Sequence, residues 1–123
     1  MINKIDTLCN ELNKYLIDRY NYKRHPASYR EDTINAKTKQ FDIYLRYQSK
    51  CVIFDKYTLV IARIGFEKTH SGNGTSLINF FLTNANTFGY TKIGIECANK
   101  NSSEFAKKLK FMNIQKNYWL LEI

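Results

Sequence analysis

The order of a strand, a glycine loop, an amphipathic helix and a second strand, over residues 58–97, constrains this fold more than any other feature. The segment TLVIARIGF is nearly continuous in apolar residues, which is typical of a central strand. After the loop THSGNGTSL, helical spacing places one apolar set on one side, namely Leu77, Ile78, Phe81, Leu82, Ala85 and Phe88. Gly89 is placed to cap this helix, and TKIGIEC alternates as a strand. The pattern predicts a mixed α/β sheet with this unit at its centre.

The rest of the chain supplies further helices and strands. Apolar residues at helical spacing predict a first helix over residues 5–20, which should end before Pro26. The segments FDIYLRY and CVIFD are expected to be strands, SSEFAKKLKF a short helix and YWLLEI a final strand. The expected order is α-β-β-β-α-β-α-β in a single domain over residues 1–123, with a mixed central sheet flanked by helices.

Composition limits the classes of protein. A content of 44% hydrophobic residues predicts a globular domain, and a net charge of +8 favours polyanionic partners. The sequence has neither a signal peptide pattern nor a run of eighteen apolar residues, so a cytoplasmic protein without membrane contact is expected. No Cys/His spacing suggests zinc, and no metal site is predicted.

The three cysteines, Cys9, Cys51 and Cys97, stand among apolar neighbours and are expected to be reduced and mostly buried. Cys97, on the alternating strand TKIGIEC, is interpreted as a core residue and not as a nucleophile. Glu96 should lie on the opposite face of that strand. There it would contact a substrate amine or serve as the cross-strand partner of a lysine.

The loop THSGNGTSL has two interpretations. A helix start leaves backbone N–H groups unpaired and carries partial positive charge, and glycines let the backbone approach a phosphate closely. The loop lacks the Gly-Lys-Ser/Thr ending of a P-loop, and Leu77 stands where a dinucleotide-binding loop has its third glycine. From these residues alone, a phosphate cradle and a plain glycine turn are both open.

The ordered series over about residues 57 to 112 resembles the acyl-CoA-binding core of the GNAT N-acetyltransferase family. In that family a bulged strand is followed by Arg/Gln-x-x-Gly-x-Gly/Ala, a long helix, a strand and a short helix ending in Leu-Gly-Phe. Here THSGNG matches the loop, FGYTKIGIEC matches the later strand, and NKNSSEFAKKLKF matches the second helix. The resemblance implies a GNAT-like fold, acetyl-CoA as acyl donor, and transfer of acetyl to an amine.

The resemblance also implies which residues contact acetyl-CoA. Backbone groups of the bulged strand, falling on Ile64 to Phe66, would bind the pantetheine arm, and Gly65 in an apolar strand is independently a bulge signal. Loop amides would cradle the pyrophosphate. Asn101 matches the family's cofactor-side asparagine, and a helix N-cap or turn residue is its alternative interpretation. The predicted acetyl-CoA-binding residues are Ile64, Gly65, Phe66, Thr69, His70, Ser71, Gly72, Asn73, Gly74, Thr75 and Asn101.

The sequence also departs from the family pattern. Thr69 replaces the family's Arg or Gln, and Lys110 replaces the glycine of Leu-Gly-Phe. Ala106 falls where many members place a tyrosine that protonates the departing CoA thiolate, and YTLVIAR lacks the glutamate that often serves as general base. Three hydroxyl residues are candidates for the missing acid, each with a structural role as the alternative: Ser102, Ser103 and Tyr118. No catalytic residue is assigned.

The connector RYNYKRHPASYREDT mixes basic and aromatic residues. Its cations, Arg19, Lys23, Arg24 and Arg30, suit a polyanion such as tRNA or an acidic protein surface beside the acceptor cleft. The alternative is a solvated loop whose tyrosines pack on the sheet.

Two functions follow, and the sequence leaves both open. The first is an acetyl-CoA-dependent N-acetyltransferase, with a protein amine or tRNA-linked amine favoured by the charge. The second is a catalytically inactive GNAT-like module that binds nucleic acid or a protein partner, including a regulator or inhibitor from a mobile element. The composition fits an AT-rich bacterial or phage genome, and NYWLLEI is a candidate pairing edge for a homodimer.

Overall fold

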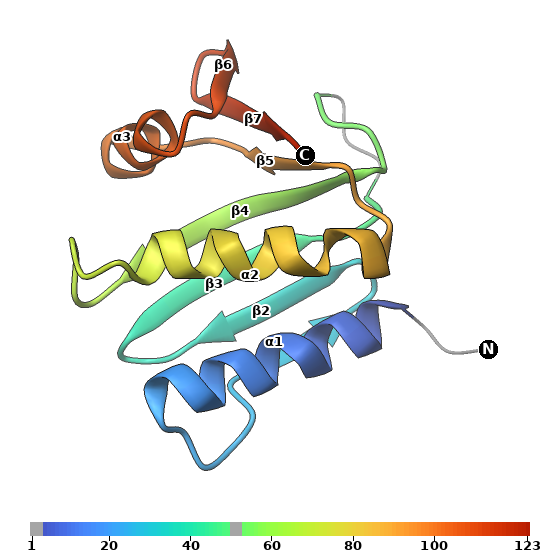
Figure 1. Cartoon of the computed structure of the whole chain (residues 1–123), viewed down its shortest axis with the longest axis vertical. Helices are drawn as coiled ribbons and strands as arrows, with labels where there is room; N and C mark the ends of the chain where they lie inside the picture. The colour runs from blue at the N-terminus through green and yellow to red at the C-terminus, as the bar shows by residue number, and fades with distance from the viewer. Residues whose placement is uncertain (1–3, 50–52) are drawn as a thin grey trace.

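Two long helices cross one face of a seven-stranded sheet in the computed structural model, which describes residues 4–49 and 53–123 (Figure 1). The helices are α1 (Lys4–Tyr20), α2 (Asn73–Phe88) and the shorter α3 (Lys100–Lys108). The strands are β1 (Ala27–Arg30), β2 (Thr33–Lys37), β3 (Phe41–Arg46), β4 (Thr58–Phe66), β5 (Lys92–Ile95), β6 (Met112–Gln115) and β7 (Tyr118–Glu122). The expected α/β class, with a mixed central sheet flanked by helices, is confirmed.

The sheet has the strand order β1-β2-β3-β4-β5-β7-β6. All neighbours are antiparallel except β4 and β5, which are parallel and joined through α2. This crossover requires a helix, because parallel strands cannot be joined by a tight turn. The long strand β4 therefore lies at the centre of the sheet, as its apolar sequence predicts.

The helices bury one apolar stripe each against the sheet. In α2 the predicted apolar positions are buried, apart from the half-buried Leu82, and Gly89 caps the helix with φ 78° and an N–H bond to the Ala85 carbonyl. In β3, Phe41, Ile43 and Leu45 are buried while the alternating residues are half exposed. These side chains and those of β4 and β5 form one continuous core.

Three parts of the chain differ from the sequence-based expectations. Residues 27–33 of the predicted connector and residues 34–37 after it form the β1–β2 hairpin, and residues 112–115 add β6 beside the final strand. The predicted strand CVIFD begins outside the described residues, and its described part, residues 53–55, is not a strand. Instead, a Cβ added at Gly94 would lie 2.7 Å from a Phe54 ring atom, so the Phe54 ring packs directly on Gly94 of β5.

Candidate functional site

Strands β4 and β5 separate partway along their length. Their pairing runs from Thr58 opposite Lys92 to Ile61 opposite Ile95, and one more bond joins the Glu96 N–H to the Ile61 carbonyl at 3.1 Å. Beyond this bond β4 continues to Phe66, whereas the segment that follows β5 turns away at Cys97, which has φ 50°. The edge of β4 that faces β5 is therefore unpaired over residues 62–66 in the described sheet.

A bulge bends β4 where this separation begins. Tyr44 pairs with Arg63 and Leu45 with Ile61, so Ala62 is an extra residue on β4. The sequence placed the bulge at Gly65, and that prediction is wrong. Gly65 is in regular register opposite Asp42, and a Cβ added there would meet nothing within 4 Å. The glycine signal was misleading because Gly65 only faces open space, whereas the bulged residue is Ala62.

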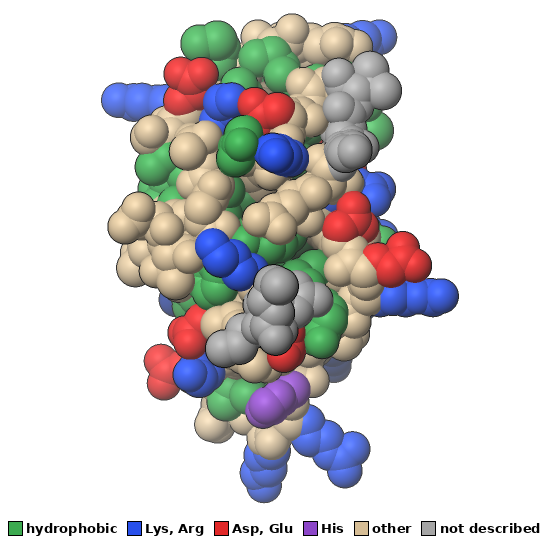
Figure 2. Space-filling view, turned by 90° about the vertical axis from the view of Figure 1, so that its right-hand side faces the viewer, with side chains coloured by type: hydrophobic (Ala, Val, Ile, Leu, Met, Phe, Trp, Pro, Cys, Tyr) green, Lys and Arg blue, Asp and Glu red, His purple; other side chains and the backbone are tan. Residues whose placement is uncertain are grey.

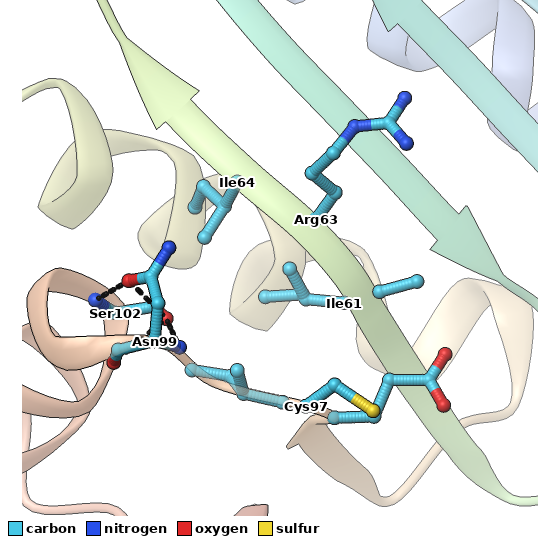
Figure 3. A pocket seen from close by; sticks show the side chains of 9 residues that line it. Ile61, Arg63, Ile64, Cys97, Asn99 and Ser102 are labelled. Carbon is cyan, nitrogen blue, oxygen red and sulfur yellow. Dashed lines mark hydrogen bonds between the residues drawn. The ribbon is translucent and has the colours of Figure 1, made fainter. Parts of the chain in front are cut away.

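The separation opens a cavity of about 240 Å³ between the two strands, which we call the wedge (Figure 3). It is lined by residues 61–64 of β4, residues 95–97 at the end of β5, and Asn99 and Ser102 at the start of α3. In Figure 3, Arg63 points toward β3, and Asn99 and Ser102 lie on the opposite side of β4. The wedge thus joins polar groups from three elements.

The loop Thr69–Thr75 lies beyond the free end of β4. Gly72 is the N-cap of α2 with φ 78°, no side chain caps the helix among the described residues, and the first turn has no acidic residue. The first helical bond is from Ser76 N–H to the Gly72 carbonyl, which leaves the amides of Asn73, Gly74 and Thr75 outside the helical ladder. The positive end of α2 is therefore open to an anion.

Each loop glycine also has a structural reason. Gly72 takes the left-handed conformation, which favours glycine. A Cβ at Gly74 would lie 2.5 Å from the Phe105 ring, so Gly74 allows α3 to pack against the start of α2. Both glycines are needed for the turn and the packing, whether or not the loop binds phosphate.

The side chains at the start of α3 are arranged differently from the prediction. Asn99, not Asn101, is the N-cap, and it forms a capping box with Ser102. The alternative interpretation of Asn101 as the N-cap is therefore wrong; Asn101 is exposed in the first turn. Sequence reasoning missed Asn99, although asparagine is a preferred N-cap residue and precedes the predicted helix.

The structure places the candidate acids at different sites. Ser102 lines the wedge, whereas Ser103 accepts a hydrogen bond from the Trp119 indole at 3.3 Å. Ala106 is fully buried in the core and is not among the residues that line the wedge. Lys110, which replaces the glycine of the Leu-Gly-Phe pattern, has φ 65°, a conformation that favours glycine.

The two described cysteines contrast. Cys9 is buried, and burial, with the Asp6 charge adding to it, raises the pKa of its thiol to about 11. Cys97 is exposed at the wedge, and its Sγ lies 3.4 Å from the Tyr118 hydroxyl, so the prediction of a core thiol is wrong. The left-handed turn at Cys97 breaks the alternation on which that prediction rested. Cys51 lies outside the described residues.

The four predicted polyanion-binding residues lie in three parts of the chain: α1, the loop after it, and β1. Arg19 donates two hydrogen bonds, of 2.9 and 3.1 Å, to Asn73 Oδ1 at the start of α2. Lys23 and Arg24 are exposed in the loop before β1, and Arg30 is at the end of β1. On the face shown in Figure 2, Lys and Arg are interspersed with Asp and Glu and gather without acidic neighbours only at the lower end.

Comparison with solved structures supports the fold. An archaeal structure, Methanocaldococcus infernus Elp3 with an N-terminal deletion, matches 83% of this chain with a TM-score of 0.59 and 17% identity. The chain spans 28% of the length of that protein. The strand, bulge, loop, helix and strand also follow one another in the order that the resemblance implied, and this match supports the same fold. The fold is GNAT-like.

Two further structures match at TM-scores below 0.5 and add nothing to this assignment. A Bacillus subtilis acetyltransferase in complex with CoA has a TM-score of 0.49 and 13% identity, covering 91% of this chain and 85% of its own. The structure of AtaT complexed with acetyl-methionyl-tRNAfMet has a TM-score of 0.47 and 13% identity. It covers 95% of this chain and 82% of its own. No model of a protein family and no curated protein matches the sequence. Among the described residues, no helix is long and apolar enough to cross a bilayer.

Proposed function

We propose that this protein binds acetyl-CoA and transfers its acetyl group to an amine. One observation carries the proposal: the unpaired edge of β4 leads from the wedge toward the uncapped start of α2. Backbone groups of residues 62–66 would bind the pantetheine arm, and the amides of residues 71–75 would bind the pyrophosphate. When bound, acetyl-CoA supplies the acetyl group as a thioester.

The chain's own residues fit such a ligand at both ends. The edge of β4 offers N–H and C=O groups that an extended arm can pair with, as an added strand does. At the loop, three helix amides lie outside the ladder and no acidic side chain in the first turn would repel phosphates. The wedge, at about 240 Å³, is suited to the reacting end of the ligand and an amine, not to a whole nucleotide.

Transfer requires an amine to lie against the thioester and requires two proton movements. Three polar side chains border the wedge where such groups belong: Glu96, Ser102 and Cys97, with Tyr118 in contact with the cysteine. Glu96 is paired with Arg46 Nε at 2.6 Å, so the cross-strand partner is an arginine and not the expected lysine.

The inactive-module alternative has one observation in its favour, which is the burial of Ala106 in the core. The family's usual acid position therefore cannot present a hydroxyl to the wedge. Under this alternative, CoA would bind or fail to bind without any acetylated amine appearing. A transfer assay on the protein that binds acetyl-CoA separates the two functions.

The test is a calorimetric titration of acetyl-CoA and CoA, with Thr75→Glu beside the wild type. A carboxylate in the first turn interacts favourably with the helix dipole, so the variant should fold. The same negative charge should repel phosphates. We expect at least about a tenfold loss of affinity in Thr75→Glu, equivalent to about 1.4 kcal/mol. The matched control is Thr83→Glu at an exposed position on the same helix, which should bind as the wild type does. Absence of wild-type binding, or equal binding by all three, contradicts the proposal.

A further inference from the structure

Two ion pairs and a tyrosine form a row on the sheet face that α1 and α2 leave uncovered, which we call the charged row. Alternation on β3 places three of its members opposite the buried Phe41, Ile43 and Leu45. The other two come from β4 and from the end of β5, and both line the wedge. The charged row consists of Asp42, Tyr44, Arg46, Arg63 and Glu96.

Short contacts fix the geometry of the row. Arg63 Nε donates to Asp42 Oδ2 at 2.8 Å, and Arg46 Nε donates to Glu96 Oε1 at 2.6 Å. Both guanidinium groups lie over the Tyr44 ring, at 5.2 Å for Arg63 and 5.6 Å for Arg46. Of the nitrogens of Arg63, only Nε has a bond to any described residue, so its two terminal nitrogens can bind a ligand anion.

The equal numbers of cations and carboxylates in the charged row indicate what charges a ligand there would carry. Two cations and two carboxylates give no net charge, which suits neither a polyanion nor a simple cation. A ligand with one positive and one negative group matches both Glu96 and Arg63 at the wedge. The basic loop residues do not change this balance, because β1 is three strands from β4, about 14 Å at ordinary strand spacing.

We propose that the acceptor is a small amine that also carries an anionic group, a carboxylate or a phosphate. This inference rests on the proposed function and names its substrate class. The ammonium group binds Glu96, and the anionic group binds the terminal nitrogens of Arg63. The ammonium first loses one proton to water, which frees the nitrogen lone pair. The amine nitrogen then bonds to the acetyl carbonyl carbon and the carbon–sulfur bond breaks. A second proton passes to the CoA sulfur, and the third stays on the amide nitrogen.

The experiment compares matched amines at saturating acetyl-CoA, with the acetylated product measured by mass spectrometry. The pairs are β-alanine against n-propylamine, for a carboxylate, and phosphoethanolamine against ethanolamine, for a phosphate. We expect kcat/KM to be at least about tenfold higher for the anionic member of one pair, and the preferred pair identifies the anion. A lysine peptide and an aminoacyl-tRNA are included as macromolecular acceptors.

Two variants change the preference in opposite directions. Arg63→Gln removes the guanidinium but keeps the backbone groups of β4, and it should abolish the preference, so that both members of a pair react at about equal rates. Titration with acetyl-CoA shows whether the variant still binds the donor, and rates are compared at saturating donor. Asp42→Asn removes the competing carboxylate and should increase the preference severalfold. Lys116→Gln, an exposed cation in the β6–β7 turn, is the charge-matched control and should behave as the wild type.

Each outcome decides. Equal rates within both pairs, acetylation of only the peptide or the tRNA, or no acetylation of any small amine by protein that binds acetyl-CoA overturns this substrate class. None of these three results contradicts the binding of acetyl-CoA. Failure to bind acetyl-CoA at all overturns the proposed function itself, and the inference with it.

Discussion

At the scale of single residues, left-handed backbone positions explain several features that the side chains alone do not. Lys110 follows α3 with φ 65°, and the Phe111 and Lys110 N–H groups bond to the Ala106 and Lys107 carbonyls. This is the arrangement in which helices usually end on glycine. The chain therefore ends α3 in a left-handed conformation without a glycine, at a cost of about 1 kcal/mol in backbone strain.

Replacing Lys110 with glycine should raise stability. Because glycine adopts this conformation without a Cβ clash, we expect the free energy of unfolding to rise by about 0.5–1 kcal/mol, measured by urea denaturation. Lys108→Gly, inside the same helix, is the control and should lower it by about 1 kcal/mol. A loss of stability in Lys110→Gly would show that the side chain, not the backbone, determines this position.

At the scale of elements, one buried polar side chain joins α1 to the first hairpin. Asn13 is 4% exposed, and its amide donates to the Ala27 carbonyl at 2.9 Å and accepts from the Ala27 N–H at 2.7 Å. Strand β1 is an edge strand with exposed residues after Ala27. These two bonds therefore hold the outer end of the sheet to the helix.

Asn13→Ala should loosen this attachment. Truncation leaves the Ala27 N–H and carbonyl without their side-chain partner, and we expect a loss of about 2–3 kcal/mol in the free energy of unfolding. Hydrogen exchange should also show faster exchange in residues 27–37 than in β4. The exposed Asn10→Ala on the same helix should change stability by less than about 0.5 kcal/mol. Equal effects of the two substitutions would refute this role of Asn13.

At the scale of the whole molecule, the free edges of the sheet are not where the sequence placed them. The final strand β7 lies between β5 and β6, so NYWLLEI is not a pairing edge, and that prediction is wrong. The outer strand is β6, all four residues of which are exposed, including Met112 at 67% and Ile114 at 39%. An exposed uncharged edge with apolar side chains is a site for pairing with another strand.

We therefore expect copies of the chain to associate through β6. Light scattering over a concentration series at about 0.15 M salt, where charge repulsion is screened, should show a growing dimer fraction. The double variant Met112→Lys and Ile114→Lys should abolish it, whereas Tyr29→Lys at the opposite edge should not. A monomer at every concentration, or a dimer that survives the double variant, would disprove pairing at β6.

Local pattern determined the central part of this fold. The apolar runs and helical spacing predict β3, β4, α2 and β5 correctly, because each element buries one face or both faces in the core. The β1–β2 hairpin escaped detection because its turn, at Glu31 with φ 55°, lacks the usual Asn-Gly or Asp-Gly signal. Strand β6 has no buried face, so its sequence carries no alternation to detect.

The sequence by itself determined the order of elements and the glycine loop, because these depend on residues close together in the chain. Only the tertiary structure decided the bulge at Ala62, the wedge and the charged row. Asp42, Arg63 and Glu96 are far apart in sequence, and strand register alone brings them to one face. Register depends on the packing of the whole sheet, and therefore the charged row could not be predicted from local spacing.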